Sequence, residues 1–140
     1  MSEENKAVVD RLTQAFNDGN PDALDGYVAA NFVGHIPLPP GVLQGVEGLK
    51  GFFAAMRAAM PDVRHPRWTL IGEGDLVMIH MPAEGTFTNA LMGIPPNGRK
   101  VVVWMANIWR LDEGKAVEWW LTMDTLGFMQ QLGVIPGAVA

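Results

Sequence analysis

The chain has 140 residues and a formal net charge of −5; hydrophobic residues make up 49% of it and charged residues 18%. This composition supplies a sizeable core, so we expect one folded domain over residues 1–140. The acidic balance argues against nucleic acid as a partner, because binding to phosphates needs clustered cations. The sequence contains no cysteine, which excludes disulfides, a thiol nucleophile and thiolate metal sites.

The N-terminal segment "MSEENK" is acidic and polar, unlike the basic start and apolar stretch of a signal peptide. No run of the sequence approaches the roughly 18 apolar residues that a membrane-spanning helix needs. We therefore expect a cytoplasmic protein with no membrane partner.

The first half of the chain has helical spacing. One apolar stripe predicts a first helix and consists of Val8, Leu12, Ala15 and Phe16. Residues 17–22 end that helix with Gly and Pro, and residues 21–32 predict a short second helix. Residues 37–41 predict a loop, because proline does not fit within a paired central strand. A third helix is predicted from about residue 46 to Pro61.

After Pro61 the apolar period changes to that of β-strands. The turns that separate the predicted strands lie at residues 72–75, 97–100 and 112–115. Residues 115–132 also fit one long helix, but two adjacent tryptophans and the tight turn before them favour a strand. A short helix is predicted at residues 126–133. Helices followed by an antiparallel meander place the chain in the α+β class.

The predicted strand at residues 101–109 is apolar on both faces. A sheet with two apolar faces must be covered twice, and the helices can cover only one of them. We expect a second copy of the chain to cover the other face, which predicts a homodimer.

The last strand, "GKAVEWWLTMD", ends at an aspartate, and its side chains alternate between two faces. One set predicts a buried sheet interface: Val117, Trp119, Leu121 and Met123. The other set predicts the lining of a partly apolar pocket: Glu118, Trp120, Thr122 and Asp124. Burial beside an indole disfavours the charged form of a carboxylate and suits it to proton transfer. Asp124 fits equally well as the N-cap of the last helix, and the two roles are compatible.

Several segments together resemble one family. "NFVGH", "GVEGLKGFFAAMRAAMPD", "GTFT…LMGIPPNGRKV", "GKAVEWWLTMD" and "QLGVIP" occur in the order and spacing of the SnoaL-like polyketide cyclase family, within the NTF2-like superfamily. The resemblance runs from about Val8 to Pro136. It implies a cone-shaped α+β barrel with N-terminal helices packed on a curved, mostly antiparallel sheet. It also implies a cofactor-free and commonly oligomeric protein, although such folds host several reactions and plain binding.

The resemblance implies roles for particular residues. The family pattern of Glu, Trp and Asp matches Glu118, Trp120 and Asp124, and its aspartate is the proposed acid/base of the cyclases. The family's histidine after "NF" matches His35, which implies a polar partner in the cavity. The chain departs from the family at three positions, where many relatives carry an ionisable side chain: Phe87, Asn107 and Trp119. These changes imply a drier cavity and a more apolar substrate.

Other residues are candidates for the same cavity. His80 lies among apolar neighbours and fits a cavity wall or a structural position. Tyr27 is a possible donor to a substrate oxygen or a half-buried helix residue, and Asn107 bonds either the backbone or a ligand. The remaining candidate lining residues fit a Met-rich core as well as a pocket: Phe16, Phe53, Met56, Phe87, Trp104 and Met105. His65, beside Pro66, is interpreted as part of a loop.

These features lead to a functional hypothesis. A cofactor-independent enzyme of polyketide-cyclase type would close a ring by aldol chemistry, with Asp124 as acid/base and His35, Asn107 or Tyr27 donating to the enolate oxygen. The three scattered histidines predict no metal site. Two alternatives remain open: a non-catalytic protein that binds a small apolar or aromatic ligand, and an isomerase or hydrolase that uses the same cavity.

Overall fold

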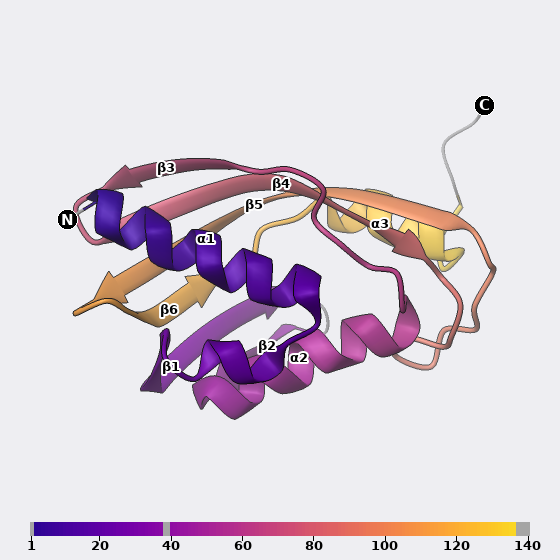
Figure 1. Ribbon diagram of the computed structural model, residues 1–140. Coiled ribbons are helices and arrows are strands. Elements are labelled where there is room, and N and C mark those ends of the chain that lie inside the picture. Colours follow the sequence, from indigo (N-terminus) through magenta and orange to yellow (C-terminus); the bar gives the residue numbers. More distant parts are fainter. Residues whose placement is uncertain (1, 38–39, 137–140) are drawn as a thin grey trace.

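The computed structural model describes residues 2–37 and 40–136 (Figure 1). In chain order the elements are α1 (Ser2–Asp18), the 3-10 helix η1 (Pro21–Leu24), β1 (Val28–Pro37), β2 (Pro40–Gln44), α2 (Gly45–Ala59), β3 (Thr69–Glu73), β4 (Leu76–Thr86), β5 (Lys100–Asp112), β6 (Lys115–Trp120) and α3 (Thr125–Leu132). The described helices and strands therefore confirm the predicted α+β class.

The strands form one open, mostly antiparallel sheet with the order β2-β1-β6-β5-β4-β3. Only the pairing of β1 with β6 is parallel among the described strands. The predicted turn at residues 112–115 joins β5 to β6, and Glu113 (φ 49°) and Gly114 (φ 78°) at its centre have left-handed backbones. Two consecutive positive φ angles match the twist of a two-residue hairpin.

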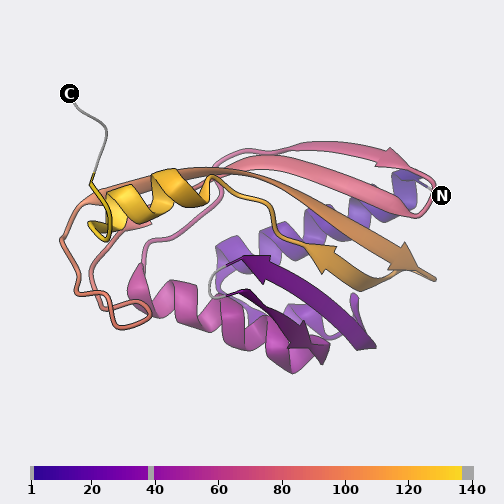
Figure 2. The same ribbon diagram turned by 180° about the vertical axis from the view of Figure 1, so that it is seen from behind.

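Helices α1 and α2 cover one face of the sheet, which we call the inner face (Figures 1 and 2). Helix α1 packs on β3, β4 and β6, and α2 packs on β1 and β2; the fully buried side chains of this core include Leu12, Leu49, Val77 and Ile79. A second buried cluster around Phe87 and Phe128 brings α3 and the end of α2 together. Removing these side chains from water is the main force that holds the layers together.

Two predicted elements were wrong. Residues 28–32, predicted as the end of a second helix, belong to β1, and only η1 of that prediction is helical. Val28 and Phe32 are both buried at a spacing of four, which imitates a helix, but pairing with β2 and β6 decides the conformation. The predicted loop at residues 37–41 is largely a hairpin, since Pro37 pairs with Pro40 at the sheet edge; residues 38 and 39 lie outside the described part.

The predicted turn at residues 97–100 is instead the end of the connection over residues 87–99, because Lys100 already pairs with Thr86 as the first residue of β5. The remaining helices and strands lie close to their predicted positions. Residues 115–120 form β6 and not the start of a long helix, and α3 follows as a separate short helix. Within residues 2–37 and 40–136, no helix is both long and apolar enough to cross a membrane.

Candidate functional site

An apolar cavity lies between the inner face of the sheet and the helices. The volume inside it that is accessible to the centre of a water molecule is about 100 Å³. Five of the predicted lining residues line it: Phe16, Phe53, Met56, Met105 and Asn107. Phe128 of α3 also contributes, as do Met81 and Ala83 of β4. Such a wall favours an apolar ligand and leaves orientation to a few polar groups.

The predicted face of the last strand is reversed in the structure. The cavity is lined by Trp119, Leu121 and Met123, and not by Trp120. Trp119 is 3% exposed and packs edge-on against Phe52 of α2, with ring centroids 5.8 Å apart. The helices therefore meet the purely apolar set of side chains, because that set buries more apolar surface.

The polar lining residues are few: Thr13, His65, Glu84 and Asn107. Asn107 is 1% exposed, and its Oδ1 accepts a hydrogen bond from the Thr122 backbone N–H at 3.2 Å. Its Nδ2 donates to the sulfur of Met105 at 3.6 Å, which is a weak acceptor. Both predicted alternatives for Asn107 are thus met, since it bonds the backbone and lines the cavity. One amide hydrogen remains for a ligand oxygen.

His65 is one of three polar lining residues that sequence reasoning missed as site residues, the others being Thr13 and Glu84. Its ring is buried, packs on Phe16 with centroids 4.7 Å apart, and bonds through Nδ1 to the Pro82 carbonyl at 3.1 Å. Burial lowers the pKa of His65 from 6.5 to about 4, and the bond to Pro82 offsets only part of that effect. The imidazole is therefore neutral at physiological pH.

Two indoles stack in the cavity wall. Trp109 and Trp119 are direct cross-strand partners, with ring centroids 5.1 Å apart and planes inclined by 22°. Within the described residues, the Nε1 atoms of both are buried and have no hydrogen-bond partner. An unpaired buried donor costs about 1–3 kcal/mol. Because neither indole N–H has a partner among the described residues, the contact between the two rings is apolar.

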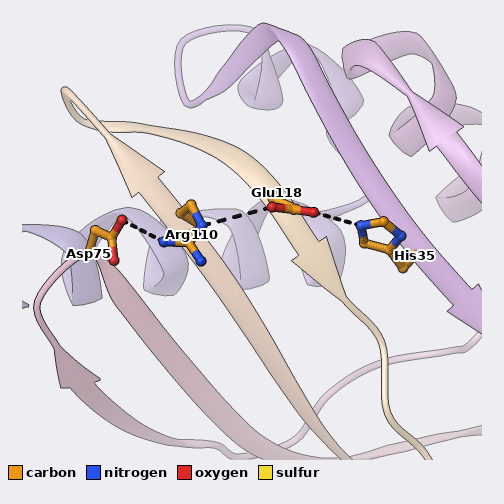
Figure 3. A network of polar contacts seen from close by, with 4 residues as sticks. All are labelled: His35, Asp75, Arg110 and Glu118. Carbon is orange, nitrogen blue, oxygen red and sulfur yellow. Dashed lines mark hydrogen bonds and ion pairs between the residues drawn. The ribbon is translucent and has the colours of Figure 1, made fainter.

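Three predicted site residues lie on the opposite, outer face of the sheet. Figure 3 shows a row of polar contacts in which Glu118 accepts from His35 Nε2 at 2.7 Å and lies 3.8 Å from Arg110, which bonds Asp75 at 2.7 Å. His35 also stacks on Trp120, with centroids 5.6 Å apart. All these side chains are partly exposed, so the ion pairs add little stability.

The geometry of β1 explains why His35 does not reach the cavity. A Cβ at the preceding Gly34 would meet the Trp119 ring at 3.2 Å, so Gly34 faces inward and His35 outward. The predicted cavity position of His35 is therefore wrong in this structure. Trp104 and His80 are also on the outer face, where they stack on each other at 4.9 Å and are exposed. Their predicted place in the cavity wall is wrong for the same reason of strand alternation.

Asp124 is the N-cap of α3. Its Oδ1 accepts from the Gly127 N–H at 2.9 Å, and the side chain is exposed. A Cβ at Gly127 would lie 2.8 Å from Asp124 Cγ, so the glycine leaves room for the carboxylate. The capping role predicted from sequence is confirmed. Within the described residues, Oδ2 accepts no hydrogen bond and is the oxygen left for other chemistry.

The last two predicted residues lie away from the cavity lining. Tyr27 precedes β1, is half-buried, and has the Arg11 guanidinium 5.9 Å from its ring centroid. Phe87 is fully buried in the second apolar cluster and does not line the cavity. The positions of Tyr27 and Phe87 therefore do not support their predicted contact with a ligand in the cavity. No group of three or more histidine and carboxylate side chains within residues 2–37 and 40–136 could hold a metal ion.

Comparisons with known proteins agree on one family. A model described as SnoaL-like polyketide cyclase matches residues 6–132. The nogalonic acid methyl ester cyclase of Streptomyces nogalater is 24% identical over 123 residues, 87% of this chain and 92% of that protein. IdmH of Streptomyces antibioticus, a candidate polyketide cyclase of solved structure, is 31% identical with a TM-score of 0.78 and coverage of 93% and 99%. A candidate SnoaL-like cyclase from Jannaschia sp. CCS1 (23% identity, TM-score 0.85, coverage 96% and 95%) has the same fold.

Proposed function

The chain belongs to the SnoaL-like polyketide cyclase family, and on that premise we propose that it closes a ring in a neutral, apolar polycarbonyl compound by an intramolecular aldol reaction without a cofactor. The observation that carries the proposal is the apolar cavity under the inner face of the sheet, because a flexible polycarbonyl chain folds into a reactive conformer when water is excluded. The similar cyclase of Streptomyces nogalater is named for a methyl ester, that of nogalonic acid.

Asp124 is the proposed acid/base. Asp124 is exposed and is not itself part of the cavity lining, but Met123 and Phe128 on either side of it line the cavity, which supports a carboxylate at the cavity edge. Oδ2 would take a proton from a carbon flanked by two carbonyls, and the resulting enolate carbon would attack a second carbonyl of the same molecule. The new carbon–carbon bond leaves an alkoxide, to which Asp124 returns the proton, so the product is an isomer of the substrate.

Asn107 is the proposed donor to the enolate oxygen. It is the buried amide of the cavity wall and has a hydrogen free of any strong acceptor. A fixed donor of this kind stabilises the negative charge that develops during the reaction. His35 and Tyr27, the other donors expected from sequence, have no part in this scheme, because His35 is bonded to Glu118 on the outer face and Tyr27 lies beside Arg11.

Conversion of nogalonic acid methyl ester is the direct test. Because ring closure leaves the mass unchanged, a product of equal mass and different retention, with a new carbon–carbon bond by NMR, is the expected result. If the compound or smaller aryl ketones bind but are never converted, the proposed reaction is wrong. A non-catalytic binding protein is the second candidate function, and the exposed position of Asp124 favours it. An isomerase or hydrolase would convert other carbonyl compounds in the same assay.

We also propose a homodimer through the outer face. Cross-strand partners form a continuous row there, which we call the outer stripe: Ile71, Met78, Ile108, Trp120, His35 and Val42. Ile71 is 56% exposed, Ile108 38% and Val42 53%. Contiguous exposed apolar side chains of this kind mark interaction sites, and a second copy offers the same stripe in return.

Replacing Ile108 by Asp is expected to convert the dimer to a monomer, because a carboxylate would be buried without a partner at the middle of the outer stripe. Light scattering after size-exclusion chromatography gives the mass directly. Ala55→Asp, with the same change of charge on the exposed side of α2, is the control and should leave the dimer intact. A wild-type protein that is monomeric at micromolar concentration would contradict the proposed interface.

A further inference from the structure

His65 is held more firmly than its place between two elements suggests. Its backbone N–H donates to Asn17 Oδ1 and its carbonyl accepts from Asn17 Nδ2, both at 2.8 Å. The preceding Arg64 exchanges two backbone hydrogen bonds with Glu84 of β4, at 2.9 and 3.0 Å. The following Pro66 restricts the backbone further. Through these hydrogen bonds the segment joins α1 to β4 and fixes the imidazole ring in the cavity wall.

The hydrogen bond to Pro82 fixes the protonation of the ring. A carbonyl oxygen can only accept, so Nδ1 carries the hydrogen. In a neutral imidazole Nε2 then has a free lone pair and acts only as an acceptor. Within the described residues no group donates to Nε2. The neutral state is the stable one here, because burial lowers the pKa of this histidine to about 4.

We infer that His65 Nε2 is the hydrogen-bond acceptor for a hydroxyl group of the ligand, and that the cavity selects compounds with a phenolic or enolic O–H. The inference rests on the proposed function, since it takes the cavity to be the ligand site. Together with the Asn107 amide, which donates, His65 gives the cavity one acceptor and one donor. An enolised 1,3-dicarbonyl or a hydroxyaryl ketone offers the complementary pair of groups.

Two other polar side chains line the cavity and are weaker acceptors for this purpose. The Thr13 hydroxyl donates to the Val9 carbonyl at 2.9 Å within α1, and its oxygen is a weaker hydrogen-bond acceptor than the basic nitrogen of a neutral imidazole. Glu84 is partly exposed and lies 3.9 Å from Lys100, so water and the Lys100 ammonium compete with a ligand for its carboxylate. His65 combines a free lone pair with burial, and a hydrogen bond to a hydroxyl gains most where water cannot compete.

Paired probes test this acceptor. 2-Naphthol and 2-methylnaphthalene have the same shape and differ only in O–H against CH₃, and isothermal titration calorimetry gives both Kd values. We expect His65→Phe to weaken binding of 2-naphthol by about tenfold or more, because its hydroxyl is left unpaired. Binding of 2-methylnaphthalene should change less than about twofold.

Two variants serve as controls. His80→Phe makes the same replacement at the exposed histidine of the outer face and should change neither Kd. Glu84→Gln tests the competing acceptor in the cavity lining, and a selective loss of 2-naphthol binding there instead of in His65→Phe would overturn the inference. Equal losses for both probes in His65→Phe would also overturn it while leaving the cavity as the ligand site. If neither probe binds the wild type, the cavity proposal fails together with it.

A measurement on the wild-type protein covers the case in which His65→Phe does not fold. The ¹⁵N resonance of His65 Nε2 reports on its lone pair, and Nδ1, which stays bonded to Pro82, is the internal reference. 2-Naphthol should shift the Nε2 resonance and leave Nδ1 nearly unchanged, whereas 2-methylnaphthalene should shift neither. An Nε2 resonance that does not respond to bound 2-naphthol would show that His65 is only structural.

Discussion

Asp124→Asn is expected to lower turnover by roughly 10²- to 10⁴-fold, the usual effect of losing a positioned proton-transfer group. The free energy of unfolding should stay within about 0.5 kcal/mol, because Asn and Asp are almost equal as N-caps. This variant therefore keeps the hydrogen bond from Gly127 to position 124 and removes only the titratable oxygen. Steady-state kinetics and denaturant unfolding on the same preparation separate the two roles.

Two further variants sharpen this experiment. Asp124→Ala removes the cap as well and should cost about 1 kcal/mol of stability in addition to activity. Gly127→Ala would push a methyl group against the carboxylate while favouring the helix by about 1 kcal/mol, so activity should fall with little loss of stability. If Asp124→Asn retains full turnover, Asp124 is only a cap and another group moves the proton.

Acidification is expected to destabilise the wild type by about 2–3 kcal/mol between pH 7 and pH 4.5 through His65 alone. In the unfolded chain this histidine binds a proton near pH 6.5, but in the folded protein burial lowers its pKa to about 4. Between these values the unfolded state holds more protons, so stability falls as the pH falls. The effect is complete only below both values.

The difference between variants isolates this contribution. His65→Phe and His65→Gln do not titrate, so their unfolding free energies should lose about 2–3 kcal/mol less than that of the wild type over the same pH range. Asp62, whose pKa is lowered by hydrogen bonds from Thr86, acts in the same direction in all three proteins and cancels. Urea unfolding of the wild type and both variants at the two pH values measures this difference in unfolding free energy. Parallel pH curves for all three would contradict a buried, neutral His65.

Local signals in the sequence were sufficient for most of the fold. The turn at residues 112–115 was predictable because the positive φ angles at Glu113 and Gly114 are those that an Asp-Glu-Gly-Lys hairpin requires. Helix α2 ends at Ala59, just before the predicted stop at Pro61. The failure at residues 28–32 came from pairing with β6, almost 90 residues later, which no local pattern contains.

The candidate site was less predictable, for a physical reason. Alternation along β6 shows that Trp119 and Trp120 face opposite ways, but not which face the helices cover. That choice depends on how much apolar surface each face buries against α2. The ionisable side chains Glu118 and His35 lie on the outer face and made that face resemble a site, whereas the cavity is apolar. Asp124, which matches the family's aspartate, does occupy the N-cap position of α3 that the sequence predicted.

The burial of His65 was not predictable from its local sequence. The residues around it, Arg64, Pro66 and Arg67, are partly or fully exposed and typical of a loop, and the segment is indeed irregular. Only the clamp by Asn17, 48 residues earlier, buries the ring against Phe16. A buried histidine outside regular structure is visible only once distant elements are placed together.

The stacked Trp109 and Trp119 rings give the molecule an optical property of its own. Indoles 5.1 Å apart and inclined by 22° couple their electronic transitions, so the pair should produce an exciton signal in circular dichroism that isolated tryptophans lack. Both rings line the cavity and are shielded from water, which shifts their fluorescence to shorter wavelengths. A molecule entering the cavity changes both signals, and the filling of the site is thus reported by the chain without any added dye.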